Sequence, residues 1–223
     1  MSFVRQSNIL DNILGIVYNS CVAYQRDVIL SLEFPSSSSL FAIHPPTYAL
    51  LDKSNKIIID KLPLNIIYVP EILRVFPKSK FIFSLRHPFD CILSCYFQNF
   101  KLNNPMSNFL KLDDAANFYS SVMEIWVKSN KVFSPKICEL KYEDLIFSFE
   151  KSINKILDFL KIEWHEELRS FNQIAKKRKI STPSYYQVTE PINNKAIDRW
   201  KNYNSEINEI KPIIEKWVKF YGY

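Results

Sequence analysis

The side chains best suited to chemistry lie close together near the middle of the chain. Arg86 follows residues 81–85, a short apolar run whose length and composition predict a strand. Pro88 and Asp90 come next, and both residue types favour the first turn of a helix. A guanidinium beside the free N–H groups of a helix N-terminus forms a site for an anion, and Ser94 is placed to add a hydroxyl donor. The alternative is that Arg86 pairs with a carboxylate or caps a neighbouring helix.

A second cationic side chain, Lys61, falls at the end of another predicted strand. Residues 56–60 are a short apolar run, and residues 66–76 after them have the spacing of a packed helix. In open α/β sheets, ligands lie outside the carboxyl ends of the strands. We therefore expect the strands at 56–60 and 80–85 to be neighbours in one sheet, with both cations at one edge. The alternative for Lys61 is a surface position in a strand–helix turn.

The elements that must hold these side chains follow from the spacing of apolar residues along the rest of the chain. Residues 135–143 predict a further strand. Residues 1–30 place their apolar side chains at roughly helical spacing, and the Pro35 segment with its four serines is the strongest linker signal. Helical periodicity recurs in residues 112–130, 148–160 and 201–223.

The composition limits the kinds of protein that this chain can be. Its 223 residues suit one domain with or without a small extension, and 47% of them are hydrophobic, enough for a sizeable core. The net charge of +6 suits an anionic ligand or a lysine-rich background, but it is not concentrated as in a dedicated nucleic-acid binder. We find neither a signal-type leader nor a run of about eighteen apolar residues, so we expect no membrane span.

The cysteines predict a reducing environment. They show no metal-type spacing, and two of them, Cys91 and Cys95, fall one helical turn apart and are expected to pack as small hydrophobes. We therefore expect a cytoplasmic protein without a metal site. The four cysteines are Cys21, Cys91, Cys95 and Cys138.

The scarcity of glycine restricts how phosphate can be bound. A loop that cradles phosphate with backbone N–H groups needs glycine for its left-handed positions and close approach, yet the chain has only Gly15 and Gly222. None of the usual glycine-rich phosphate loops can be written here. Residues 40–47 read as a short strand and a polar turn, but two prolines lack N–H groups, which disfavours a phosphate loop there.

The segment at residues 81–100 resembles the 3′-phosphate-binding segment of the sulfotransferase family. The resemblance rests on Arg86, His87, Pro88, Asp90, Ser94 and the aromatic and amide residues after them. It is strongest to the bacterial-type branch that is often fused to tetratricopeptide repeats and is similar to protein-tyrosine sulfotransferases. Residues 60–65, 142–145 and 181–200 resemble further family segments and occur in family order. The resemblance implies an α/β fold of three layers, with a parallel sheet of the P-loop nucleotide-kinase-like sulfotransferase type.

The same resemblance implies roles for individual residues. Arg86 and Ser94 would bind the 3′-phosphate of 3′-phosphoadenosine 5′-phosphosulfate (PAPS), and Lys61 would lie beside the sulfuryl group being transferred. The acidic pair of residues 143–144 would open a helix and act mainly in the architecture. We expect Arg86, Ser94, Ser184 and Lys195 to surround one anion-sized pocket. The residues implied to contact the nucleotide from the late loop are Ser184, Gln187, Val188 and Lys195.

Part of the family pattern is absent. The resemblance covers residues 48–223, whereas the family's first strand and its glycine-containing phosphosulfate loop should lie upstream. We expect residues 1–47 to be a divergent extension and residues 48–223 a partial domain, from a truncated or frame-split gene or a divergent relic. Residues 28–32 or 40–43 are the candidates for the central strand's place. No catalytic base is identified; His44 and Glu33 are weak candidates.

Three functional hypotheses follow. The first is a metal-independent sulfotransferase that uses PAPS and a hydroxyl or amine acceptor, which could be a protein tyrosine, a carbohydrate or a small molecule. The second is a non-catalytic protein that binds PAPS or adenosine 3′,5′-bisphosphate. The third, a nucleic-acid binder using the basic run at 176–179 with Tyr185 and Tyr186, is disfavoured because that run is short and local. We expect little or no sulfotransferase activity from this chain alone.

Overall fold

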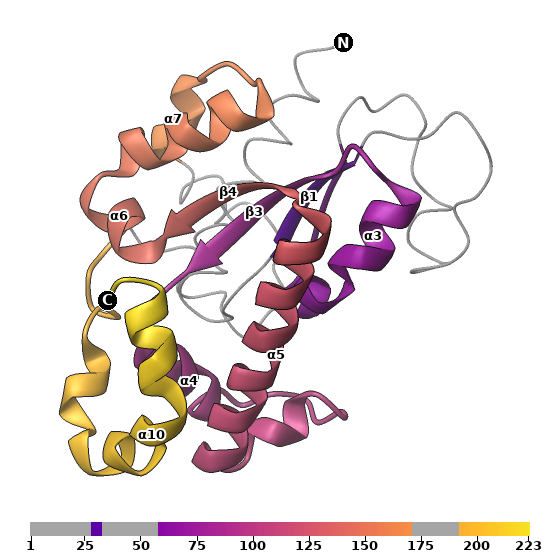
Figure 1. The fold of residues 1–223 in the computed structure, drawn as a ribbon. Helices are drawn as coiled ribbons and strands as arrows, with labels where there is room; N and C mark the ends of the chain where they lie inside the picture. The colour runs from indigo at the N-terminus through magenta and orange to yellow at the C-terminus, as the bar shows by residue number, and fades with distance from the viewer. Residues whose placement is uncertain (1–27, 33–57, 171–191) are drawn as a thin grey trace.

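A mixed four-stranded sheet forms the centre of the computed structural model, which describes residues 28–32, 58–170 and 192–223 (Figure 1). The order of the described strands is β2-β1-β3-β4. β3 and β4 pair in parallel, while β1 runs antiparallel to both β2 and β3. The strands are β1 (Val28–Leu32), β2 (Ile58–Leu62), β3 (Lys80–Leu85) and β4 (Lys136–Lys141).

Most of the described helices occur where the apolar spacing predicts them. The expected helix at 66–76 begins as the 3-10 helix η1 and becomes α-helical only after Tyr68. The α-helices are α3 (Val69–Val75), α4 (Pro88–Tyr96), α5 (Leu112–Phe133), α6 (Tyr142–Phe147), α7 (Phe149–Leu160) and α10 (Asn204–Phe220). The 3-10 helices are η1 (Pro63–Tyr68), η2 (Met106–Phe109), η3 (Glu166–Ser170) and η4 (Arg199–Asn202).

The sheet lies between two helical layers. Alternation along β3 sends Phe81 and Phe83 into a core shared with α3, α4, α5 and α10, whereas Ile82 faces the core of α6 and α7. Figure 1 shows α6 and α7 on one side of the strands and α3 and α5 on the other. The predicted three-layer α/β fold is therefore confirmed, with β1 as a departure from a purely parallel sheet.

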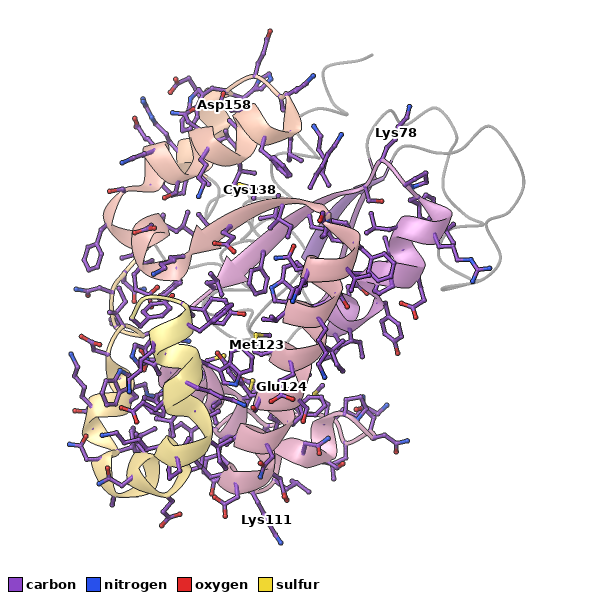
Figure 2. All side chains as sticks on the ribbon, in the orientation of Figure 1. Lys78, Lys111, Met123, Glu124, Cys138 and Asp158 are labelled. Atoms are coloured by element: carbon purple, nitrogen blue, oxygen red, sulfur yellow. The ribbon has the colours of Figure 1, made fainter. Side chains whose placement is uncertain are left out.

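Helix α5 is the main support of the larger core. Its apolar face packs Trp126 against Phe83 of β3, with ring centroids 4.6 Å apart. Figure 2 shows the side chain of Met123 in the interior, while Lys78, Lys111 and Asp158 project at the periphery. Within the described residues, no helix is long and apolar enough to cross a membrane. Cys91, Cys95 and Cys138 are buried, as expected of small packing side chains.

The prediction that the strands at 56–60 and 80–85 are neighbours is wrong, because β1 lies between β2 and β3. Val28 pairs with both Leu62 and Phe83, so the two strands share one sheet but are separated by one strand. The expected helix over 1–30 therefore does not extend through Val28–Leu32. This segment instead fills the central place, one of the two alternatives that the sequence left open.

The direction of β1 matters for the site. Because β1 is antiparallel to its neighbours, its first residue, Val28, lies beside the carboxyl ends of β2 and β3. Its last residue, Leu32, pairs with Ile58 at the opposite edge of the sheet. Leu32, the residue at which β1 ends, therefore lies at the edge of the sheet opposite to Arg86.

Candidate functional site

The predicted strand, turn and helix around Arg86 are confirmed. β3 ends at Leu85 and α4 begins at Pro88, with His87 as the N-cap residue. The His87 Nδ1 atom accepts a hydrogen bond from the Phe89 N–H at 3.3 Å, which satisfies one of the free donors of the first turn. The His87 N–H donates to Glu143 Oε1 at 3.1 Å. Glu143, at the start of α6 directly after β4, therefore fixes the turn between β3 and α4.

The Arg86 guanidinium is buried at the carboxyl end of β3. The residue is 3% exposed, and its Nη2 donates a hydrogen bond to the carbonyl oxygen of Ala196. Its Cζ lies 5.3 Å from the centre of the Tyr142 ring, and the Tyr142 hydroxyl is 3.5 Å from the Asn193 carbonyl oxygen. The segment around residues 193 and 196 therefore covers this cation, and the Ala196 carbonyl oxygen accepts a hydrogen bond from one of its N–H groups.

Asp90 joins the same part of the chain to α4. Its Oδ2 accepts from the Asp198 N–H at 2.9 Å, and its Oδ1 accepts from the Trp200 N–H at 2.8 Å. Burial raises the pKa of this carboxyl above its usual value, while the nearby Arg86 and the two backbone donors oppose the rise. The sequence suggested only a first-turn acid here, because its partners are 108 and 110 residues away.

Ser94 belongs to the face of α4 that meets the end of the chain. It lies four residues after Asp90, so the two share a helix face. Phe97, at the end of this face, lies 5.0 Å from the ring of Tyr203, and the Arg199 guanidinium stands 5.2 Å over the Phe97 ring. The helix face that carries Ser94 is thus bordered by a second cation, Arg199, from the segment at 181–200 that resembles a family segment.

His87 is held as a neutral ring among aromatic side chains. Its imidazole stacks on Trp200 at 5.0 Å and meets the edge of Tyr223 at 5.2 Å. Burial lowers the pKa of His87 from 6.5 to about 4, with Asp198 opposing the change. Because Nδ1 accepts from the Phe89 N–H, the proton lies on Nε2, and the ring has no second acceptor with which to act as a base.

Trp200 presents a buried donor at this site. Its indole Nε1 has no hydrogen-bond partner among the described residues. Its ring is fixed by the stack on His87 and by contact with Phe89 at 5.3 Å. An unpaired buried N–H is costly to the folded state.

The predicted role of the acidic pair in the architecture rests on Glu143. Its Oε2 accepts a hydrogen bond from the Tyr223 hydroxyl at 2.9 Å, while its Oε1 accepts from the His87 N–H. Lys141 donates to the Gly222 carbonyl oxygen at 3.1 Å, and its Nζ lies 4.3 Å from the centre of the Tyr223 ring. The end of the chain is therefore tied to the carboxyl ends of β3 and β4, as Figure 1 shows for the segment after α10.

The other predicted site residues stand at different distances from this centre. Lys61 lies in β2, one residue before the strand ends, rather than in the turn after it. It is level with Ile82 of β3, two strand spacings or about 10 Å away. Lys195 is exposed; its N–H donates to Asn193 Oδ1 at 3.2 Å, and it directly precedes Ala196.

The structure thus brings together Arg86, the Ser94 face of α4 and the Lys195 segment. Whether they form one pocket with Ser184 stays a prediction. Ser184, Gln187, Val188, Glu33 and His44 lie outside the described residues.

The arrangement is chemically suited to an anion. A buried guanidinium and the N-terminus of α4 meet at the carboxyl edge of the sheet; Ser94 lies further along the same helix, Arg199 stands over Phe97 at its end, and Lys195 directly precedes Ala196. Within the described residues, no cluster of three or more His, Cys, Asp or Glu side chains could hold a metal ion.

Comparisons with known proteins agree with the fold. A model of the sulfotransferase family matches residues 32–166. An uncharacterized protein of Aquifex aeolicus (strain VF5) is 30% identical over 175 residues, which are 77% of this chain and 22% of that protein. The chain therefore spans about a fifth of the length of this curated relative.

A solved structure supports the fold alone. The sulfotransferase domain from the curacin biosynthetic pathway superposes with a TM-score of 0.50 and 21% identity. The match covers 73% of this chain and 64% of that domain.

Proposed function

The chain belongs to the sulfotransferase family, and from this premise we propose that it carries a PAPS-binding site of the kind used to transfer a sulfuryl group to a hydroxyl or amine acceptor, with little or no transfer by this chain alone. The observation that carries the proposal is the buried Arg86 at the end of β3, directly before the N-terminus of α4. A buried guanidinium directly before a helix N-terminus is a local arrangement that suits a phosphate group.

The residues present suit a phosphate at this position. The Ala196 carbonyl oxygen on Arg86 stands where an anion oxygen would accept the same hydrogen bond. The Trp200 indole N–H adds a buried donor that has no partner among the described residues. We assign Arg86 and Ser94 to the 3′-phosphate, with Lys195 and the residues Ser184, Gln187 and Val188 covering the nucleotide.

The roles at the reacting end of the nucleotide rest on family resemblance. Lys61 would stabilise the charge that develops on the bridging oxygen as the S–O bond to the phosphate breaks. A base would take the proton of the acceptor as its oxygen or nitrogen bonds to sulfur. No described residue is assigned to this base. The acceptor is a protein tyrosine, a carbohydrate or a small molecule.

The test is calorimetric titration with adenosine 3′,5′-bisphosphate. We expect Arg86→Ala to weaken binding by about 1.5–3 kcal/mol, the range for hydrogen bonds to a charged group. Arg169→Ala is the control, because this exposed arginine pairs with Glu150 and Glu166 and leaves the proposed site intact. Equal affinities for wild type and Arg86→Ala, with the variant folded by circular dichroism, would remove the proposed site.

A second function is binding without transfer. The observation in its favour is that no glycine occurs between Gly15 and Gly222, so the usual cradle for the phosphosulfate cannot be built from that stretch. In this case Arg86 and Ser94 would retain the nucleotide and nothing would be transferred. A turnover assay separates the two functions.

A further inference from the structure

Asp90 is a buried carboxylate that the proposed reaction does not use. It is 1% exposed in the first turn of α4, and both its oxygens accept hydrogen bonds from backbone N–H groups of residues 198 and 200. A carboxylate so deeply buried is stable only where donors replace water. The two donors belong to a single turn, so one side chain fixes that turn to the helix.

The turn that Asp90 holds is an unusual one. Asp198 has φ of 58°, in the left-handed region that non-glycine residues rarely adopt. Such a conformation persists where the surroundings determine it, and here the Asp198 N–H is bound to Asp90. The chain changes direction between Ala196, which contacts Arg86, and Trp200, which stacks on His87.

The late segment, residues 193–200, is thereby attached to the strand–helix turn at several points. Arg86 holds the Ala196 carbonyl, Asp90 holds two N–H groups, and His87 stacks on Trp200. Of these contacts, only the hydrogen bond to the Ala196 carbonyl uses a donor, Arg86 Nη2, that a bound anion would also use. The Asp90 contacts can remain when the Ala196 carbonyl gives way to a phosphate oxygen.

We propose that Asp90 is a positioning residue of the anion site, which keeps residues 193–200 ordered beside Arg86 so that they cover a bound phosphate. The inference rests on the proposed function, because it concerns the same nucleotide site. Asp90 does not touch the ligand. It lowers the entropy cost of binding, because a segment that is not anchored must be immobilised when the ligand arrives.

The test measures binding kinetics with adenosine 3′,5′-bisphosphate as the probe. For Asp90→Ala we expect the affinity to fall about fivefold to thirtyfold, which corresponds to about 1–2 kcal/mol. The loss should lie in a faster dissociation rate, with the association rate nearly unchanged because Arg86 still attracts the anion. Asp90→Asn should be intermediate, since its amide keeps one acceptor but turns a donor toward the other N–H.

A matched control and a structural readout keep the test decisive. Asp114→Ala removes an exposed acid from the first turn of α5, an equal charge change away from the site, and should bind as wild type does. Amide hydrogen exchange should show residues 198 and 200 protected in the wild type and exchanging faster in Asp90→Asn. Slow exchange in both proteins would overturn the inference even if Asp90→Ala fails to fold.

The outcomes also separate this inference from the proposed function. If Arg86→Ala weakens binding and Asp90→Ala and Asp90→Asn do not, Asp90 has no positioning role and the anion site stands. If none of these variants changes the affinity, the proposed site itself is wrong. If Asp90→Ala slows association as much as it speeds dissociation, the variant has damaged the site in general, and this result would overturn the inference.

Discussion

At the scale of single residues, His87 links the site to pH. The ring is held neutral because burial lowers its pKa from 6.5 to about 4, and Nδ1 is engaged by the Phe89 N–H. In the unfolded chain the same side chain gains a proton as the pH falls through 6.5, whereas the folded protein gains it only near pH 4. The stability that His87 provides is therefore present above pH 6.5 and is lost between pH 6.5 and 4.

We expect His87→Asn to flatten this part of the stability curve. Asparagine retains an N-cap acceptor for α4 but does not titrate. The full pKa shift corresponds to ~3 kcal/mol, and screening of the half-buried ring by solvent reduces it to ~1–2 kcal/mol. Urea unfolding at several pH values between 4.5 and 7.5 measures the difference between the two proteins. A difference that does not change with pH would contradict the assignment of a neutral His87.

The residues of the site were predictable to different degrees. Arg86 and Ser94 could be predicted because a strand, a proline, a first-turn acid and a serine follow one another within residues 81–94. The position of Asp90 in a first helical turn could be predicted from its neighbours in the sequence. Its function as an anchor could not, because its hydrogen-bond donors are 108 and 110 residues further along the chain. Arg199 and Trp200 belong to the segment at 181–200 that resembles a family segment, but their individual contacts could not be predicted, because only the folded chain brings η4 to α4.

At the scale of elements, the pattern predicted helices better than the order of the strands. α5 and α7 carry a long apolar face, which the 3.6-residue period reveals. β1 is five residues long and has no such signal, and its place depends on partners that lie far along the chain. The neighbour relation of β2 and β3 was therefore wrong although both strands were predicted near their observed positions.

The end of α10 is joined to the start of α6 by a bond that can be measured. The Tyr223 hydroxyl donates to Glu143 Oε2 at 2.9 Å, and the other Glu143 oxygen accepts from the His87 N–H. We expect Tyr223→Phe to lower the free energy of unfolding by about 1 kcal/mol, the usual net value of such a hydrogen bond. Urea denaturation of Tyr223→Phe, Glu143→Gln and the double variant gives the coupling. Strict additivity of the two single changes would show that the bond contributes nothing.

At the scale of the whole molecule, the proposed site assigns the two ends of the nucleotide to two different strands. The 3′-phosphate would lie at the end of β3, where Arg86 precedes α4, and the sulfuryl group near Lys61 at the end of β2. Between them runs β1, whose first residue rather than its last lies at this edge. In α/β folds that bind phosphate, the cradle follows the carboxyl end of a strand. A loop leaving Leu32 starts at the other edge.

This geometry leads to the prediction that the 223-residue chain binds the nucleotide but does not turn it over. Arg86 and Ser94 provide affinity at one end, whereas transfer requires the sulfur to be aligned with the acceptor, and such alignment supplies a large share of catalysis. Lys61 alone is a point charge and cannot orient the phosphosulfate as a set of backbone donors does. We therefore expect measurable binding of adenosine 3′,5′-bisphosphate and PAPS consumption at background with phenolic and sugar acceptors. Consumption above background that disappears in Lys61→Ala would show that the chain builds a phosphosulfate cradle without glycine.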